Sequence, residues 1–212
     1  MSGRGGSLFA FILKAIGTCL KGYPEFNSMI DFRKRTIFTE VDIDIPIEVR
    51  KHGELYNIQH IIRDVSGTTL AQIHIDIENA KETAGDERAY MKSGLVQKII
   101  TRLPRRLVLF IFRRILKTHA LVKRMSGTVF VTSVSMFSNV PGYIIPYAGG
   151  SKSVSFAVGS VTQKPVVRNN AVAAREMINI TAMFNHDAVD GAPAARSINR
   201  MRKCIEHEYM EL

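Results

Sequence analysis

Apolar residues recur every three or four positions over residues 8–20, which is the spacing of one helix face. They are Leu8, Phe11, Ile12, Ala15, Ile16, Cys19 and Leu20. Over residues 41–49 the period falls to two, because Val and Ile alternate there with acidic residues and one proline. That alternation predicts a half-buried strand with one acidic, solvated face. The chain therefore begins with a helix and continues into a sheet.

The same two periods return in the rest of the chain. A helical stripe is formed by Leu70, Ile73, Ile77 and Ala80. Residues 178–184 alternate like a strand, and a second helical stripe follows at Ala194, Ile198, Met201 and Ile205. This order of elements predicts an α/β two-layer sandwich, with a mixed sheet and the helices on one face.

Length and composition fit one domain. The chain has 212 residues, of which 46% are hydrophobic, enough for a core of ordinary size. Residues 1–7 are rich in Gly and Ser and predict a flexible leader. We therefore assign residues 8–212 to a single domain.

Charge is unevenly distributed along the chain. The net charge is +10, yet no Asp or Glu lies between Glu87 and Glu176, an interval that holds fifteen Lys and Arg. From Lys98 to Arg124 the basic residues interleave with Leu, Ile, Val and Phe, as in a basic amphipathic helix. We predict a basic helical insert at about residues 84–126, interrupted near Pro104.

A candidate catalytic motif follows the last predicted strand. His186, Asp190 and Gly191 form the pattern His-x-x-x-Asp-Gly, and Pro193 then suits a first helical turn. A histidine at such a corner can offer one ring nitrogen to a substrate while the backbone or a carboxylate holds the other. His186 is therefore a candidate general base. The alternative is an ordinary loop histidine, because this short pattern also arises by chance.

Four segments resemble one enzyme family. The segment Gly127-Thr128-Val129-Phe130-Val131-Thr132-Ser133-Val134-Ser135-Met136-Phe137 is similar to a Ser/Thr-rich strand of the catalytic domains of dihydrolipoamide acyltransferases. Residues 154–161 resemble the next core strand of that family, and residues 23–27 and 61–65 also have counterparts. These domains form the cores of 2-oxo acid dehydrogenase complexes, and the resemblance implies a chloramphenicol acetyltransferase-like fold.

The resemblance implies an enzyme that transfers an acyl group between two thiols. His186 would take the proton from the attacking thiol, and a hydroxyl of the Ser/Thr-rich strand would stabilise the oxyanion. The matching hydroxyls are those of Thr132 and Ser133, and the sequence does not separate them. Asp190 and Gly191 would organise the loop, Asp190 by pairing with an arginine and Gly191 by allowing a turn where a side chain would be crowded.

The resemblance also implies substrates and partners. Coenzyme A would be a substrate, and a lipoyl group, if used, would arrive on another chain, on a lipoyl carrier domain or with other dehydrogenase-complex subunits. In this family the site is shared between subunits, so we expect a homotrimer or a multiple of three.

Some features depart from the family pattern and support an alternative. Ser135 stands where the family has glycine, and Asn185-His186-Asp187 replaces its usual Asp-His-Arg. The family also carries more residues before the first helix, as well as lipoyl and subunit-binding domains that this sequence does not contain. The alternative is a non-catalytic trimeric scaffold or assembly protein of the same fold.

The basic insert has three interpretations. It can pack on the sheet with a solvated cationic face, where its arginines would attract the phosphates of coenzyme A or an acidic carrier domain. It can instead lie on an anionic membrane surface. Nucleic acid is the least favoured partner, because no binding motif accompanies the charge.

Cysteine usage and the N-terminus bear on compartment and metal content. Cys19 and Cys204 lie far apart and have no metal-binding or redox spacing, which favours a reducing compartment. Lys14 interrupts the first apolar run, and no small-residue cleavage site follows it. We therefore predict a cytoplasmic protein without a metal site.

Overall fold

The computed structural model describes residues 7–31, 34–51, 54–84, 102–135, 142–146, 151–168 and 170–211. Its helices are α1 (Leu8–Lys21), α2 (Leu70–Ala84), α4 (Arg105–Leu116), α5 (His119–Ser126), α6 (Gly191–Glu211) and the short 3-10 helix η1 (Pro24–Phe26). Its strands are β1 (Ser28–Ile30), β2 (Arg35–Ile37), β3 (Ile43–Lys51), β4 (Glu54–Ile62), β5 (Val129–Ser133), β6 (Val154–Arg168) and β7 (Ala171–Phe184). Residues 1–6 of the predicted leader and 85–101 of the predicted insert lie outside the described residues.

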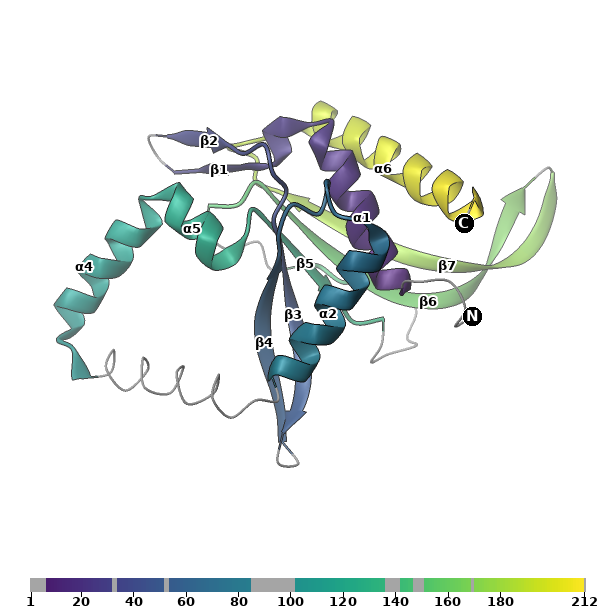
Figure 1. Ribbon diagram of the computed structural model, residues 1–212. Helices are drawn as coiled ribbons and strands as arrows, with labels where there is room; N and C mark the ends of the chain where they lie inside the picture. Colours follow the sequence, from purple (N-terminus) through teal and green to yellow (C-terminus); the bar gives the residue numbers. More distant parts are fainter. Residues whose placement is uncertain are drawn as a thin grey trace.

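A five-stranded mixed sheet in the order β4-β3-β5-β6-β7 forms one layer. β3 and β5, and likewise β5 and β6, run parallel, whereas the β3–β4 and β6–β7 pairs are antiparallel. Helices α1, α2 and α6 lie together on one face of this sheet (Figure 1). The predicted α/β sandwich with helices on one face is therefore confirmed. We call the sheet face that points away from these three helices the second face.

Helix α1 is the centre of the helical layer. Nine of its residues are buried, and its Ser7 cap accepts a hydrogen bond from the backbone N–H of Ala10 at 3.2 Å. Lys14, the charge within this apolar helix, donates to the carbonyls of Val65, Ser66 and Thr68 at 3.3, 3.0 and 2.7 Å. The lysine therefore fixes the turn after β4 to the helix instead of interrupting it.

Strand β3 follows the predicted alternation, and Glu48 is solvated as predicted, but the two aspartates at its start are not. Ile43, Ile45 and Ile47 enter the core beneath the helices. The prediction of a solvated acidic face is wrong at Asp42 and Asp44, which are only 2% and 6% exposed. Both carboxylates have cationic partners, which is the condition under which charged groups are buried.

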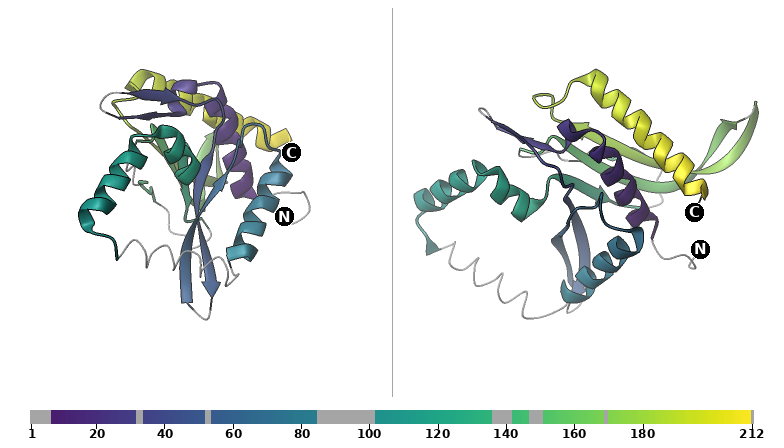
Figure 2. Two further views of the ribbon diagram at one scale, coloured as in Figure 1. Left: turned by 60° about the vertical axis from the view of Figure 1, so that its left-hand side comes forward. Right: turned by 45° about the horizontal axis from the view of Figure 1, so that its top comes forward.

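Strands β6 and β7 form a long hairpin that sets the position of the following loop. They pair from Val154–Phe184 to Arg168–Ala171, with one register shift between Val158 and Val161. The tip of the hairpin reaches beyond the other strands (Figures 1 and 2). Because β7 ends beside the start of β6, the loop that carries His186 lies at the edge of the sheet where β6 begins.

The described part of the predicted insert contains α4 and α5, and we call these two helices the arm. Pro104 precedes α4, where its missing N–H costs no helical hydrogen bond. The arm lies to one side of the sheet in each view (Figures 1 and 2). α4 buries none of its residues, so the interpretation in which the insert packs on the sheet does not hold for α4. Within the described part of the chain, no helix has the length and apolarity needed to cross a membrane.

Helix α5 attaches the arm to the rest of the domain. His119 is buried at its start, with Nδ1 at 2.7 Å from the Thr36 hydroxyl and Nε2 at 3.5 Å from the Asp31 carboxylate. Both partners belong to the β1–β2 hairpin and its turn. This contact between hairpin and helix orders the base of the arm.

Candidate active site

His186 lies in the loop between β7 and α6. Asn185, the residue before it, donates its backbone N–H to the Ser153 carbonyl at 2.9 Å, which extends the β6–β7 pairing by one step. The Asn185 carbonyl accepts from the backbone N–H groups of Ala188 and Val189 at 3.0 and 3.1 Å. The side chains of those two residues are buried, whereas His186 is exposed. The loop is therefore anchored on both sides of a histidine that faces solvent.

The Asn185 side chain closes the same turn. Its Oδ1 accepts from the backbone N–H of Asp187 at 3.0 Å, which is an Asx-turn. Sequence reasoning treated Asn185 only as a departure from the family pattern and missed this role. The usable signal was Asn directly after a strand, because Asn side chains commonly bond the backbone two residues on.

Asp190 and Gly191 lie at the junction with α6. Asp190 is exposed and precedes the first helical residue, where a carboxylate is favoured by the helix dipole. Among the described residues it has no arginine partner, so the expected ion pair is not found within one chain. The expected crowding at Gly191 is not found either, because a Cβ there would meet no atom within 4 Å.

The hydroxyl residues Thr132 and Ser133 are adjacent on strand β5, so they lie on opposite faces of the sheet. Val131 is fully buried in the core beneath the helices, so alternation directs Thr132 to the second face and Ser133 to the helical side. The Ser133 hydroxyl lies 2.8 Å from the hydroxyl of Ser135. Thr132 pairs with Ala157 of β6. Of the two hydroxyls, that of Thr132 is therefore on the face that no helix of the sandwich covers.

The structure does not bring His186 and Thr132 together within one chain. Along β6, the partner of Thr132 is Ala157, whereas Val154 pairs with Phe184. Ala157 is three residues from Val154, and His186 is two residues beyond Phe184. These five residues correspond to a separation of roughly 17 Å along the strands. A single chain therefore cannot place the imidazole on the substrate atom that the Thr132 hydroxyl contacts.

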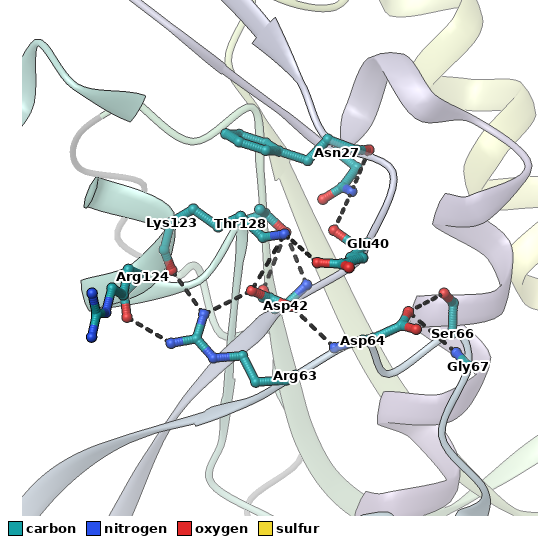
Figure 3. A network of polar contacts seen from close by, with 11 residues as sticks. Asn27, Glu40, Asp42, Arg63, Asp64, Ser66, Gly67, Lys123, Arg124 and Thr128 are labelled. Atoms are coloured by element: carbon teal, nitrogen blue, oxygen red, sulfur yellow. Dashed lines mark hydrogen bonds and ion pairs between the residues drawn. The ribbon is translucent and has the colours of Figure 1, made fainter. Parts of the chain in front are cut away.

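A buried polar network fixes the start of β5, the strand that carries Thr132 and Ser133 (Figure 3). The Asp42 carbonyl accepts from the backbone N–H groups of Thr128 and Val129 at 2.7 and 3.1 Å. The Thr128 hydroxyl in turn accepts from the Asp42 backbone N–H at 3.1 Å. Gly127 has a φ of 62°, and a Cβ there would approach the Asp42 carbonyl to 2.7 Å. Only glycine fits this close approach of β5 to β3.

The Asp42 carboxylate links this network to the arm (Figure 3). It accepts from the Arg63 guanidinium at 2.7 Å and from the backbone N–H of Asp64 at 3.0 Å. Arg63 also donates to the carbonyls of Lys123 and Arg124 at 3.1 and 2.6 Å, which caps the C-terminal end of α5. Sequence reasoning quoted residues 61–65 for their resemblance but assigned them no role. The residues that Arg63 contacts are far away in sequence.

Replacing Asp42 with alanine should lower the free energy of unfolding by about 2–3 kcal/mol, because the guanidinium and an N–H group would lose a buried acceptor. Urea unfolding of the whole protein measures this change. Lys123 Nζ lies 3.7 Å from the Asp42 carboxylate and 2.7 Å from that of Glu40, which is 60% exposed. The matched control is therefore Glu40→Gln, which should change stability by less than about 0.5 kcal/mol. Equal losses in the two variants would contradict the central role of Asp42.

A buried ion pair lies on the second face. Lys152 Nζ is 3.2 Å from the Asp44 carboxylate and 5.7 Å from the centre of the Phe130 ring. Burial raises the pKa of Asp44 and lowers the pKa of Lys152, because desolvation of each group exceeds their mutual attraction. Phe130 and Thr132 share one face of β5. The pair therefore packs against the strand that carries the candidate hydroxyl.

Three further features of the described residues were candidates for a second site: clusters of metal ligands, the Cys19 thiol and a pocket. Among the described residues, no three His, Cys, Asp or Glu side chains are grouped as metal ligands would be. Burial raises the pKa of the Cys19 thiol to about 11, so this thiol stays protonated at neutral pH. A pocket of about 400 Å³ lies between α1, α6 and the outer strands, with Phe11, Ile178 and Met201 among its lining residues. None of the predicted site residues lines it.

Comparison with known proteins places the chain in a family. The family model of the 2-oxoacid dehydrogenases acyltransferase (catalytic domain) matches residues 3–93 and 119–212. The chain is similar to the lipoamide acyltransferase component of the branched-chain alpha-keto acid dehydrogenase complex of Bacillus subtilis, with 27% identity over 94% of this chain. The chain spans only 39% of the length of that relative.

Two solved structures share the fold. A probable dihydrolipoamide acetyltransferase from Listeria monocytogenes has a TM-score of 0.66 and 22% identity, covering 96% of this chain and 72% of its own. An Azotobacter vinelandii dihydrolipoamide acetyltransferase, studied for the roles of a serine, a histidine and an asparagine in its catalytic mechanism, has a TM-score of 0.64 and 18% identity, covering 95% and 69%. The family match extends over both halves of the sandwich, so the chain belongs to the family of 2-oxoacid dehydrogenase acyltransferase catalytic domains.

Proposed function

We propose that this protein transfers an acyl group between coenzyme A and a dihydrolipoamide or another thiol, with His186 as the general base. The observation that carries the proposal is the presentation of His186, an exposed ring on a loop held by the backbone contacts of Asn185 and the buried side chains of Ala188 and Val189. A base must be free on its reactive side and fixed in position, and this loop meets both conditions.

The reaction needs one proton acceptor and one oxyanion donor. An unprotonated ring nitrogen of His186 takes the S–H proton of the attacking thiol, and the thiolate adds to the thioester carbonyl of the donor. A hydroxyl O–H donates to the resulting oxyanion. When the tetrahedral intermediate collapses, the carbonyl forms again and the donor's C–S bond breaks. The departing thiolate then receives the proton from the imidazolium, so the histidine is regenerated.

We propose that the hydroxyl is that of Thr132 and that it comes from a neighbouring subunit. Support comes from the second face, to which Thr132 points, and from the separation of roughly 17 Å along the strands between His186 and Thr132 of one chain. In a ring of subunits joined by head-to-tail contacts, the His186 of each subunit faces the Thr132 of one neighbour. A homotrimer, or a multiple of three, is the assembly proposed here.

Substrates and partners follow from the same chemistry. One similar protein is a component of a branched-chain alpha-keto acid dehydrogenase complex, and another is a probable acetyltransferase. Membership of the family therefore does not identify the acyl group that this protein transfers. We propose that coenzyme A is one thiol substrate and that a lipoyl group, where used, is presented by a carrier domain. Thiol substrates require a reducing environment, and both Cys19 and Cys204 are free thiols, in keeping with a cytoplasmic protein.

The test is acyl transfer from a panel of acyl-coenzyme A donors to dihydrolipoamide, with the oligomeric mass recorded on the same samples. Activity with at least one donor, from a trimeric species, is the expected result. A trimer that never exceeds the uncatalysed rate with any donor would contradict the proposal. That outcome would favour the non-catalytic scaffold of the same fold.

A further inference from the structure

Helix α4 exposes an apolar surface that no other described residue of the protein covers. None of its twelve residues is buried. Phe110 and Phe112 are 59% and 51% exposed, and four other large apolar side chains are more than 40% exposed, namely Leu107, Leu109, Ile111 and Leu116. Helix α1, by contrast, buries nine of its residues against the sheet and its neighbouring helices. Contiguous apolar surface of this kind marks an interaction site.

The charge of α4 is of one sign. Arg105 and Arg106 begin the helix, Arg113 and Arg114 lie in its last turn, and Lys117 follows it. No acidic residue lies in α4 or anywhere between Glu87 and Glu176. The guanidinium of Arg114 lies 5.8 Å from the ring centre of Phe110, one turn earlier. Phe110 therefore lies among the arginines on one side of the helix, whereas Leu107, Ile111 and Ile115 lie on the opposite, apolar side.

α4 also lies outside the part of the chain that the family shares. The two segments matched by the family model end at residue 93 and resume at residue 119, so residues 94–118 lie between them. α4 falls entirely within this stretch. In the views of Figure 2 it is the outer helix of the arm, away from the sheet. Its surface is therefore an addition to the acyltransferase domain.

We propose that α4 binds an anionic lipid surface, lying in the plane of the membrane interface. An occupant must supply negative charge and an apolar layer together, and anionic headgroups above acyl chains supply both. The helix is about 18 Å long, which is short for a hydrocarbon core of about 30 Å but sufficient for an interfacial helix. Nucleic acid would neutralise the arginines but leave the apolar side, with Ile111 and Phe112, in water. A second copy fits less well, because the chain carries a net charge of +10.

A fluorescent reporter tests insertion directly. The chain contains no Trp, so Phe112→Trp creates a single indole in α4. We expect its emission to shift to the blue when vesicles of phosphatidylcholine and phosphatidylglycerol are added, and to stay unchanged with phosphatidylcholine alone. The control is Ile75→Trp on α2, where the native side chain is 56% exposed and no shift is expected.

Vesicle sedimentation with two further variants tests the two components of the surface. Arg113→Gln with Arg114→Gln should weaken partitioning to the anionic vesicles by about thirtyfold. The control Arg200→Gln with Lys203→Gln removes the same charge from α6 and should bind like the wild type. Ile111→Ser with Phe112→Ser should also lose binding, whereas Ile75→Ser should not. Because both side chains are exposed, thermal unfolding of the double variant should remain unchanged.

Three outcomes would overturn the proposal. In the first, the wild type does not bind any anionic vesicle. In the second, the α4 variants bind as well as the wild type. In the third, the indole at position 112 would already emit at short wavelength in the vesicle-free oligomer, which would identify a second copy as the occupant. None of these measurements uses a thioester, so their results are independent of the proposed acyl transfer.

Discussion

Replacing His186 with alanine should lower the rate of acyl transfer by roughly a hundred- to ten-thousandfold, because the attacking thiol would lose its proton acceptor. The exposed ring contributes little to packing, so the free energy of unfolding should change by less than about 0.5 kcal/mol. Single-turnover transfer from acyl-coenzyme A to dihydrolipoamide measures the rate, and urea unfolding measures the stability. The separation of these two effects distinguishes a catalytic histidine from a structural one.

Asp187→Asn is the matched control for this variant. Asp187 is the exposed neighbour of His186, and its backbone N–H, which is kept in the variant, makes the contact with Asn185. We expect the control to retain most of the wild-type rate. A His186→Ala protein that transfers acyl groups as fast as the wild type would contradict the assignment of the base.

Replacing Thr132 with valine should lower kcat by roughly a hundred- to a thousandfold, because valine keeps the shape of the side chain and removes the oxyanion donor. Ser133→Ala should have a much smaller effect, since that hydroxyl lies on the helical side of β5 and contacts Ser135. The measurement is kcat and KM for both variants, with the loss in Thr132→Val expected mainly in kcat. A larger loss in Ser133→Ala would show that the chemistry uses the other face of the strand.

Periodicity predicted most of the sandwich. The helix over residues 8–20, the strand over 41–49 and the helix starting at Leu70 correspond to α1, β3 and α2. These elements each bury one face, so apolar residues recur along them with the period of a helix or a strand, and this pattern does not depend on which element covers the face. The location of His186 between a strand and a helix was predictable for the same reason.

Contacts between distant residues were not predictable from these patterns. The alternation of β3 predicted that Asp42 and Asp44 face away from the core, but not that Arg63 and Lys152 would bury them. The pattern of α4 predicted an amphipathic helix, but a period does not show whether anything covers the apolar side. The sequence did not show which of Thr132 and Ser133 lies on the second face, because that depends on the faces of β5, and these became known from the burial of Val131.

The central claim is that each site combines His186 of one subunit with Thr132 of another, and mixing two inactive variants tests it most directly. His186→Ala and Thr132→Val, assembled together in equal amounts, should recover about a quarter of the wild-type rate, because one His–Thr pair in four would combine two intact residues. Each variant assembled alone should remain inactive. If the mixed oligomers form but stay as inactive as the separate variants, His186 and Thr132 do not share a site between subunits.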